Sequence, residues 1–293
     1  MKNIFMKTLF RLPHLILLLF VPFGACTNDT SNTKEVILNS DDSLALINSK
    51  PNTITFPKFD MVISDIPFPF EILDNLYSQK IPFDKKATNE ATNVSKYNQY
   101  NSKALNLGIY GADLAYSVTY EEFQQMGVYV KTTKRLAEEL NIPYAFDQSM
   151  MDKYSQYKDN KDSLTRIVYE SYNQVDIALK NDERVGLAAL VVTGSWLEGL
   201  YLSTKTFVDV SKTEANKSLY KVIGGQKQSL VIVIKLLDEY KKDLFISNVI
   251  ADLKDITSEY NAITSDIAMN EAQLKAIHAK VETLRTKIVS GKY

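Results

Sequence analysis

The chain has one cysteine and two histidines among 293 residues, and this scarcity excludes several kinds of catalytic site. His14 lies in the N-terminal apolar segment, so His278 is the one histidine left for the rest of the chain. A Ser-His-Asp triad would depend on His278, and a Cys-His pair would have to recruit Cys26 from beside the apolar segment. Histidine-rich zinc sites, Cys-X-X-Cys motifs, the Gly-X-Ser-X-Gly elbow and the phosphate-binding loop are also missing. We therefore expect no metal site and no cofactor.

The position of the one cysteine indicates an export signal. Three basic residues occur among the first eleven, residues 15–23 are apolar apart from Pro22, and Phe23-Gly24-Ala25-Cys26 follows. A basic start, a short apolar core and small residues before a cleavage site are typical of a secretory signal. The last four residues resemble the lipobox of bacterial lipoproteins, and this resemblance implies that Cys26 is acylated, with chains such as palmitate, and anchors the protein to the inner or outer membrane. The alternatives are an ordinary signal peptide with an incidental cysteine, or an uncleaved anchor helix.

The charge balance gives no reason to expect nucleic-acid binding. The chain has 34 basic and 35 acidic residues, and removal of residues 1–25 would leave 31 basic residues against 35 acidic ones. A net charge of −4 does not favour phosphate backbones or anionic lipid surfaces. We expect residues 1–25 to be a signal peptide and the polar residues 26–60 to be a tether, followed by a helical body over 61–243 and a separate C-terminal helix over 244–293.

The distribution of proline predicts an all-α body. All eight prolines lie at or before Pro143, and apolar residues recur at helical spacing from Val94 onward. The fold class we expect is a helical bundle of antiparallel hairpins. Gly224-Gly225 should kink or split one helix. The predicted helices cover residues 70–79, 94–118, 120–140, 146–158, 162–180, 184–204, 214–241 and 244–289.

Two of these helices have the composition of central elements. The first, 94–118, carries glycines and alanines that let another helix approach closely. The second, 185–202, is apolar on nearly every side, which is typical of a buried helix or a membrane span. Its three glycines and Glu198 favour burial over a membrane span. Asp113 precedes Tyr116 as Glu198 precedes Tyr201, which suggests a duplicated hairpin.

Two segments carry a family resemblance. "NLGIYGADLAY" and "GSWLEGLYLST" resemble segments of uncharacterised all-helical lipoproteins of Bacteroidetes-type bacteria, over roughly residues 60–290. No activity is established for that group. The resemblance therefore implies a fold and a cellular location, but no catalytic activity.

The C-terminal segment has a heptad pattern. Apolar residues advance by alternating steps of three and four from Ile246 to Ile288, with Asn270 as the one polar interruption. This spacing predicts one long coiled-coil-like helix. It would pack on residues 214–241 of the same chain, or pair with a second copy or a foreign helix in antiparallel orientation. His278 falls on the flank of the heptads, where we expect it to be solvated.

The scarcity of histidine and cysteine does not exclude a catalytic site built from carboxylates. Glu198 and Asp113 fall within predicted core helices, where a carboxylate must be paired, hydrogen-bonded or protonated. They are the candidate catalytic residues of a glycosidase-like site, but a hydrogen bond from a tyrosine or arginine to Glu198 is the favoured interpretation. Trp196 and Tyr201 are candidates for lining a ligand pocket, with core packing again favoured.

These patterns leave three functions open. The first is a membrane-tethered lipoprotein that works by binding or assembly, through the heptad helix or through the surfaces of the helical body. An assembly role predicts an exposed apolar seam on residues 246–288. The second is a carboxylate-based hydrolase of envelope glycans, which needs two carboxylates in one cleft about 5–10 Å apart. The third is a small-ligand-binding lipoprotein, which needs an aromatic cavity without that pair. The scarcity of catalytic side chains makes an enzyme the less favoured class.

Overall fold

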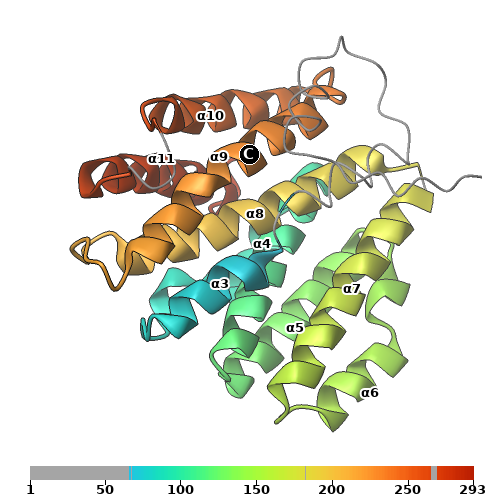
Figure 1. Cartoon of the computed structure of the whole chain (residues 1–293). Helices are drawn as coiled ribbons and strands as arrows, with labels where there is room; N and C mark the ends of the chain where they lie inside the picture. Colours follow the sequence, from blue (N-terminus) through green and yellow to red (C-terminus); the bar gives the residue numbers. More distant parts are fainter. Residues whose placement is uncertain (1–65, 67, 182, 265–268) are drawn as a thin grey trace, which may run out of the picture. The chain divides into compact units, whose positions relative to one another are not determined.

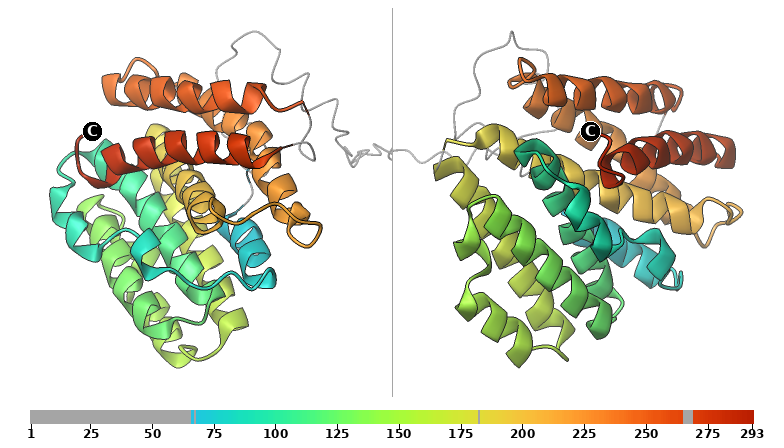
Figure 2. Two further views of the ribbon diagram at one scale, coloured as in Figure 1. Left: turned by 90° about the vertical axis from the view of Figure 1, so that its left-hand side faces the viewer. Right: turned by 180° about the vertical axis from the view of Figure 1, so that it is seen from behind.

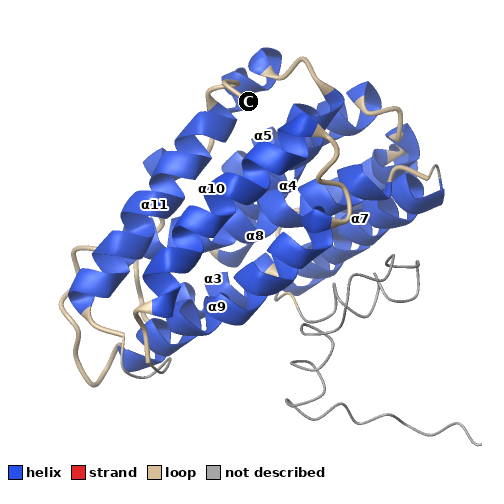
Figure 3. Ribbon diagram, turned by 90° about the horizontal axis from the view of Figure 1, so that it is seen from above, coloured by secondary structure: helices blue, strands red, loops and turns tan. Residues whose placement is uncertain are grey.

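Helices and short connections make up the described part of the chain, with no strand among these residues (Figures 1 and 3). The computed structural model describes residues 66–293, except 67, 182 and 265–268, so the predicted signal peptide, Cys26 and the tether lie outside the described residues. This confirms the predicted all-α helical bundle. The α-helices are α3 (Pro69–Ser78), α4 (Tyr100–Thr119), α5 (Phe123–Glu139), α6 (Gln148–Gln156), α7 (Lys161–Asn181), α8 (Val185–Phe207), α9 (Lys217–Asp238), α10 (Leu244–Asn261) and α11 (Glu271–Val289).

Several helix ends are followed by a residue other than glycine in the left-handed conformation. Lys80, Glu121 and Asn141 follow the ends of α3, α4 and α5 with φ between 57° and 59°. A left-handed residue just after the last turn closes a helix because its backbone N–H reaches back to the final carbonyls. Residues 94–96 belong to a 3₁₀ turn, so α4 begins at Tyr100 and not at Val94 as predicted.

Helices α4 and α8 form the centre of the body and run parallel to each other. A Cβ atom built on Gly108 would lie 2.0 Å from the carbonyl oxygen of Val191, and one on Gly194 would lie 1.9 Å from that of Leu105. Only glycine allows backbones to approach this closely. The close approach predicted from the small residues of the first central helix is therefore confirmed, with α8 as its partner.

The remaining helices lie on either side of this central pair, and the views in Figures 1 and 2 agree on the arrangement. Helices α5 and α7 pack on α4, with α6 on α7, while α9 and α11 pack on α8 and α10 lies against both of them. Helix α3 contacts α4, α8 and α9. The core is continuous through both groups.

Helix α8 is long and apolar enough to cross a membrane, but 78% of that apolar window is buried inside the body. The helix is thus a core helix, as its glycines and Glu198 predicted. Of the two outcomes predicted at Gly224-Gly225, the split is wrong, because α9 is continuous from Lys217 to Asp238. Two glycines weaken a helix, but here the packing of α9 on α8 and α10 maintains it.

The prediction of one helix over residues 244–289 is wrong. Helix α10 ends at Asn261, and α11 begins at Glu271 after a connection that contains Asn270. The Asn270 side chain accepts a hydrogen bond from the backbone N–H of Gln273, whose side chain accepts one from the backbone N–H of Asn270. Such a capping box starts a helix. The polar interruption of the heptads is therefore a helix start.

The described heptad residues pack against other helices of the same chain. Helix α10 packs on α9, as the preferred interpretation required, while α11 packs on α8 and α10. The apolar residues of the seam that the structure describes are buried, from Ile246 to Ile263 on one side of the connection and from Leu274 to Ile288 on the other, while Ile267 lies outside the described residues. The described part of 246–288 therefore does not present the exposed seam that an assembly role through this segment requires.

Candidate functional site

A buried ion pair joins the C-terminal helix to the centre of the body. Glu198 of α8 is 0% exposed, and Arg285 of α11 is 8% exposed. The guanidinium donates from Nε to Oε2 at 2.9 Å and from Nη2 to Oε1 at 2.7 Å. This two-bond geometry is the strongest form of the arginine–carboxylate interaction. The expectation that Glu198 is held by an arginine or tyrosine is thus met by Arg285.

Asp113 of α4 meets Glu198 across the central helix pair. It is also 0% exposed, and its carboxyl group lies close enough to that of Glu198 for the two to interact electrostatically. Its Oδ2 accepts the backbone N–H of Asn89 at 3.1 Å, whereas its Oδ1 has no hydrogen-bond partner. Two buried carboxyl groups this close to each other repel unless one of them holds a proton.

The charge balance assigns that proton to Asp113. Burial raises the pKa of Asp113 well above its usual range, and the neighbouring Glu198 carboxylate raises it further. Burial alone would lower the pKa of Arg285, but the attraction of Glu198 outweighs this effect and the pKa is raised. We infer a neutral Asp113 beside a complete Glu198–Arg285 ion pair.

Further contacts hold the Arg285 guanidinium and the end of α11 in place. The guanidinium carbon of Arg285 lies 4.2 Å from the centre of the Tyr201 ring, and Nη2 donates to the carbonyl of Ala87 at 3.0 Å. The Tyr97 hydroxyl donates to the carbonyl of Val289 at 3.1 Å, which fixes the end of α11. The cluster therefore joins α4, α8, α11 and the 3₁₀ segments before α4.

The two candidate catalytic residues are thus together but sealed. A glycosidase needs its carboxyl groups on opposite sides of a glycosidic bond, with room for the sugar. Asp113 and Glu198 instead contact each other directly, and neither has solvent-exposed surface. The arrangement stabilises the fold and offers no access to a glycan.

His278 lies on the same side of α11 as Arg285, one heptad earlier. The prediction that it is solvated is wrong, because the residue is buried and its Nδ1 lies 3.1 Å from Oγ1 of Thr204. Burial lowers the pKa of His278 below 6.5. On this flank of α11, His278 and Arg285 face α8 and are buried.

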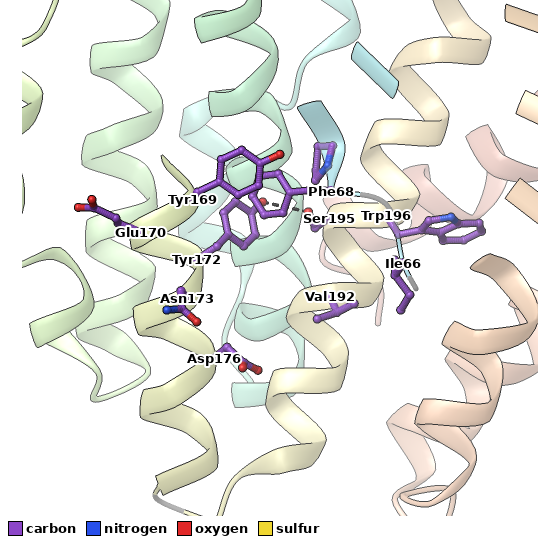
Figure 4. A pocket seen from close by; sticks show the side chains of 11 residues that line it. Ile66, Phe68, Tyr169, Glu170, Tyr172, Asn173, Asp176, Val192, Ser195 and Trp196 are labelled. Carbon is purple, nitrogen blue, oxygen red and sulfur yellow. Dashed lines mark hydrogen bonds between the residues drawn. The ribbon is translucent and has the colours of Figure 1, made fainter. Parts of the chain in front are cut away.

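A cavity of about 480 Å³ opens between α7, α8 and the residues before α3 (Figure 4). Its lining comprises Ile66, Phe68, Pro69, Tyr169, Glu170, Tyr172, Asn173, Asp176, Val192, Ser195 and Trp196. Most of this surface is apolar, and the volume lies in the range of about 300–1,000 Å³ that is usual for small-molecule sites.

Aromatic rings form one end of the cavity. The Phe68 ring stacks on Tyr169, with 4.2 Å between ring centres, and meets Tyr172 edge-on at 4.7 Å. A Cβ atom on Gly111 would collide with the Tyr172 hydroxyl, so this glycine lets the tyrosine reach α4. The Tyr172 hydroxyl donates to the carbonyl of Gly108 at 3.1 Å.

The sequence candidates for ligand binding separate in the structure. Trp196 lines the cavity, and its indole N–H donates to Oε1 of Gln226 at 3.0 Å. Tyr201 does not line it and instead stacks against Arg285. Sequence reasoning missed Tyr169, Tyr172, Asn173 and Asp176, although their spacing places them on one face of α7.

Comparisons with known proteins add no family to this description. A scan against protein-family models, a search of curated proteins and a search of solved structures each find no match.

Proposed function

We propose that the chain is an envelope-anchored binding protein that holds a small, mainly apolar ligand in the cavity between α7 and α8. The observation that carries this proposal is the cavity itself, with aromatic rings at one end and no part of the carboxyl cluster in its lining. An aromatic cavity without a carboxylate pair across it is the arrangement that a ligand binder requires and a glycosidase does not.

The cavity has the features that make apolar binding favourable. Phe68 and Val192 offer carbon surface from opposite walls, and a ligand that covers such surface gains about 25 cal/mol for each Å² removed from water. Tyr172 is held by Gly108 and Ser195, so its ring is already positioned before a ligand arrives. Preorganised walls reduce the entropy lost on binding.

The envelope anchor rests on the sequence. Cys26 and its lipobox-like neighbours lie outside the described residues, and the scarcity of other cysteines is consistent with a tether in place of a disulfide. We expect metabolic labelling with an alkyne analogue of palmitate to mark the wild-type protein and not Cys26→Ala. Equal labelling of both proteins would contradict the anchor without bearing on the cavity.

Trp196 provides a direct test of binding because it is the one tryptophan of the chain. The neutral dye N-phenylnaphthylamine absorbs where tryptophan emits, so its binding in the cavity should quench Trp196 and increase the dye's own emission. Val192→Phe, which narrows the cavity, should weaken dye binding about tenfold or more, an amount equivalent to about 1.4 kcal/mol.

The matched control is Ile177→Phe. Ile177 lies on α7, the helix that forms one wall of the cavity, but it is exposed and does not line the cavity. The proposal requires wild-type dye affinity in this variant. Saturable binding that both substitutions leave unchanged, or no quenching of Trp196 at all, would overturn the proposed function.

A further inference from the structure

Phe68 lies at one end of the cavity between α7 and α8 (Figure 4). One proline precedes it in the sequence and another follows it. Proline fixes its own φ and favours extended backbone at the residue before it, and Phe68 has φ −65° and ψ 147°. The sequence itself therefore restrains the backbone that carries this ring.

Helix α3 fixes this segment to α8. The carbonyl oxygen of Phe68 accepts the backbone N–H of Glu71 at 3.0 Å, which starts the helix. A Cβ atom built on Gly199 of α8 would be in van der Waals contact with Ile72, at 3.7 Å, and with Pro69, at 3.8 Å. The first turn of α3 therefore lies against α8, and Phe68 directly precedes this turn.

The ring of Phe68 reaches from this point to α7. It contacts the rings of Tyr169 and Tyr172, and Figure 4 shows the three rings together at one end of the cavity, with Val192 and Asp176 farther along the two helices. Because α3 holds its backbone near α8 while its ring contacts two side chains of α7, Phe68 crosses the space between the two helices. It therefore forms an end wall of the cavity.

Apolar surface continues behind this end wall. The centre of the Phe70 ring lies 5.7 Å from that of Phe68 and 5.4 Å from that of Tyr169. Phe70 is 3% exposed and does not line the cavity. Removal of the Phe68 ring would therefore extend the cavity onto the Phe70 ring and give a ligand more apolar surface to cover.

We propose that Phe68 determines the length of the ligand that the cavity accepts, because its ring ends the apolar surface between α7 and α8. This inference rests on the proposed function, since it concerns the ligand of the same cavity. Each methylene that enters the cavity leaves water and should strengthen binding about fourfold, equivalent to about 0.8 kcal/mol. Once a chain extends from the Phe68 ring to the open side of the cavity, further methylenes stay in water and add no affinity.

A series of straight-chain primary alcohols, from butanol to dodecanol, measures this limit. The alcohols differ only in the number of methylenes and carry no charge, so their affinities report the apolar length of the cavity. We would measure how well each displaces N-phenylnaphthylamine from the full-length protein, from the emission of the dye. Affinity for the wild type should rise with chain length and then level off at one member of the series. In Phe68→Ala, the rise should continue to longer alcohols.

Phe68→Leu and Tyr77→Ala are the companion variants. Leucine keeps an apolar side chain before α3 but is shorter than phenylalanine, so the limit should move in the same direction by a smaller amount, and the test stands if Phe68→Ala fails to fold. Tyr77→Ala also removes an aromatic ring near this segment, from α3, but Tyr77 is 45% exposed and does not line the cavity. Its limit should be that of the wild type.

The outcomes distinguish this inference from the function on which it rests. A limit that moves to longer alcohols in the Phe68 variants, and stays in place in Tyr77→Ala, supports Phe68 as the end wall. The same limit in the wild type and both Phe68 variants, or an equal move in all three variants, overturns this role while the cavity remains a binding site. Affinity for the wild type that rises along the whole series also overturns it. Failure of the dye and every alcohol to bind the wild type overturns both proposals.

Discussion

Two faces of the same helix, α8, differ in how completely they are filled. The face toward α4 and α11 holds Glu198 in a cluster whose charges and donors are matched, and it has no solvent access. The face toward α7 holds Ser195 and Trp196 beside about 480 Å³ of open volume. Reactive residue types therefore mark the structural centre of this protein, while the unfilled volume marks the site that we propose to be functional.

Adding side-chain volume should destabilise the protein far more on the filled face of α8 than on the open face. Gly194→Ala places a Cβ atom 1.9 Å from the carbonyl oxygen of Leu105, so we expect it to destabilise the fold by more than about 3 kcal/mol. Val192→Phe, on the open face, should change stability by less than about 1 kcal/mol. Urea unfolding followed by circular dichroism measures both values.

Gly127→Ala is the control for replacing a helical glycine. Nothing lies within 4 Å of its added Cβ atom, so it should stabilise α5 by about 0.5–1 kcal/mol. Similar stability losses in Gly194→Ala and Val192→Phe would show that the two faces are equally packed.

The ion pairs near the two faces should also differ. Arg285→Met leaves the Glu198 carboxylate buried without its cation, which should cost about 3–5 kcal/mol. Lys153→Met removes the partner of Glu170 on the solvent-exposed side, and the unfolding midpoint should not move. Adding Glu198→Gln to Arg285→Met should restore part of the lost stability. Equal effects of Arg285→Met and Lys153→Met would contradict a sealed cluster.

A small effect is expected for Asp113→Asn. The asparagine side chain is neutral and has nearly the shape of a protonated aspartic acid, so the free energy of unfolding should change by less than about 1 kcal/mol in acid. The pKa of Asp113 is raised in the folded state, so its contribution to stability is complete below the unfolded pKa and declines as pH rises toward the folded pKa. The variant lacks this decline.

Unfolding curves of wild type and Asp113→Asn between acid and neutral pH test the assignment of the proton. The stability of the variant relative to wild type should increase with pH over this range. A relative stability that decreases with pH would place a charged Asp113 in the fold.

Much of the fold followed from the sequence because it depends on local patterns. The absence of proline after Pro143 and the helical spacing of apolar residues predicted most helices to within a few residues. The small residues of α4 and the apolar surface of α8 predicted two buried central helices. Each of these features acts through neighbouring residues or one helix surface, so the sequence carries it directly.

The misplaced elements have identifiable reasons. The heptad spacing continues from α10 into α11 because each half of this hairpin must bury its own seam, so the spacing alone did not reveal the turn. The sequence did contain a signal in Asn270 and Gln273, which have the spacing of a capping box. His278 was misjudged because a heptad has one buried seam only when a helix has one partner, and α11 packs on both α8 and α10.

The candidate site was the least predictable part. Asp113 and Glu198 were singled out correctly as buried, but the sequence did not indicate that they meet each other or that Arg285 joins them. Of the two ligand-binding candidates, Trp196 lines the cavity and Tyr201 contacts Arg285 instead, since successive turns of α8 face different neighbours. The unfilled volume between α7 and α8 arises from how whole helices pack, so no local pattern in the sequence predicts it.

The most direct test is a crystal structure with a brominated N-phenylnaphthylamine bound, in which anomalous scattering locates the bromine. The account predicts a bromine peak within the cavity, among the residues of α7, α8 and the segment before α3 that line it. A bromine peak outside the lining of this cavity, or none at concentrations that saturate Trp196 fluorescence, would contradict the claim that the open face of α8 is the binding site.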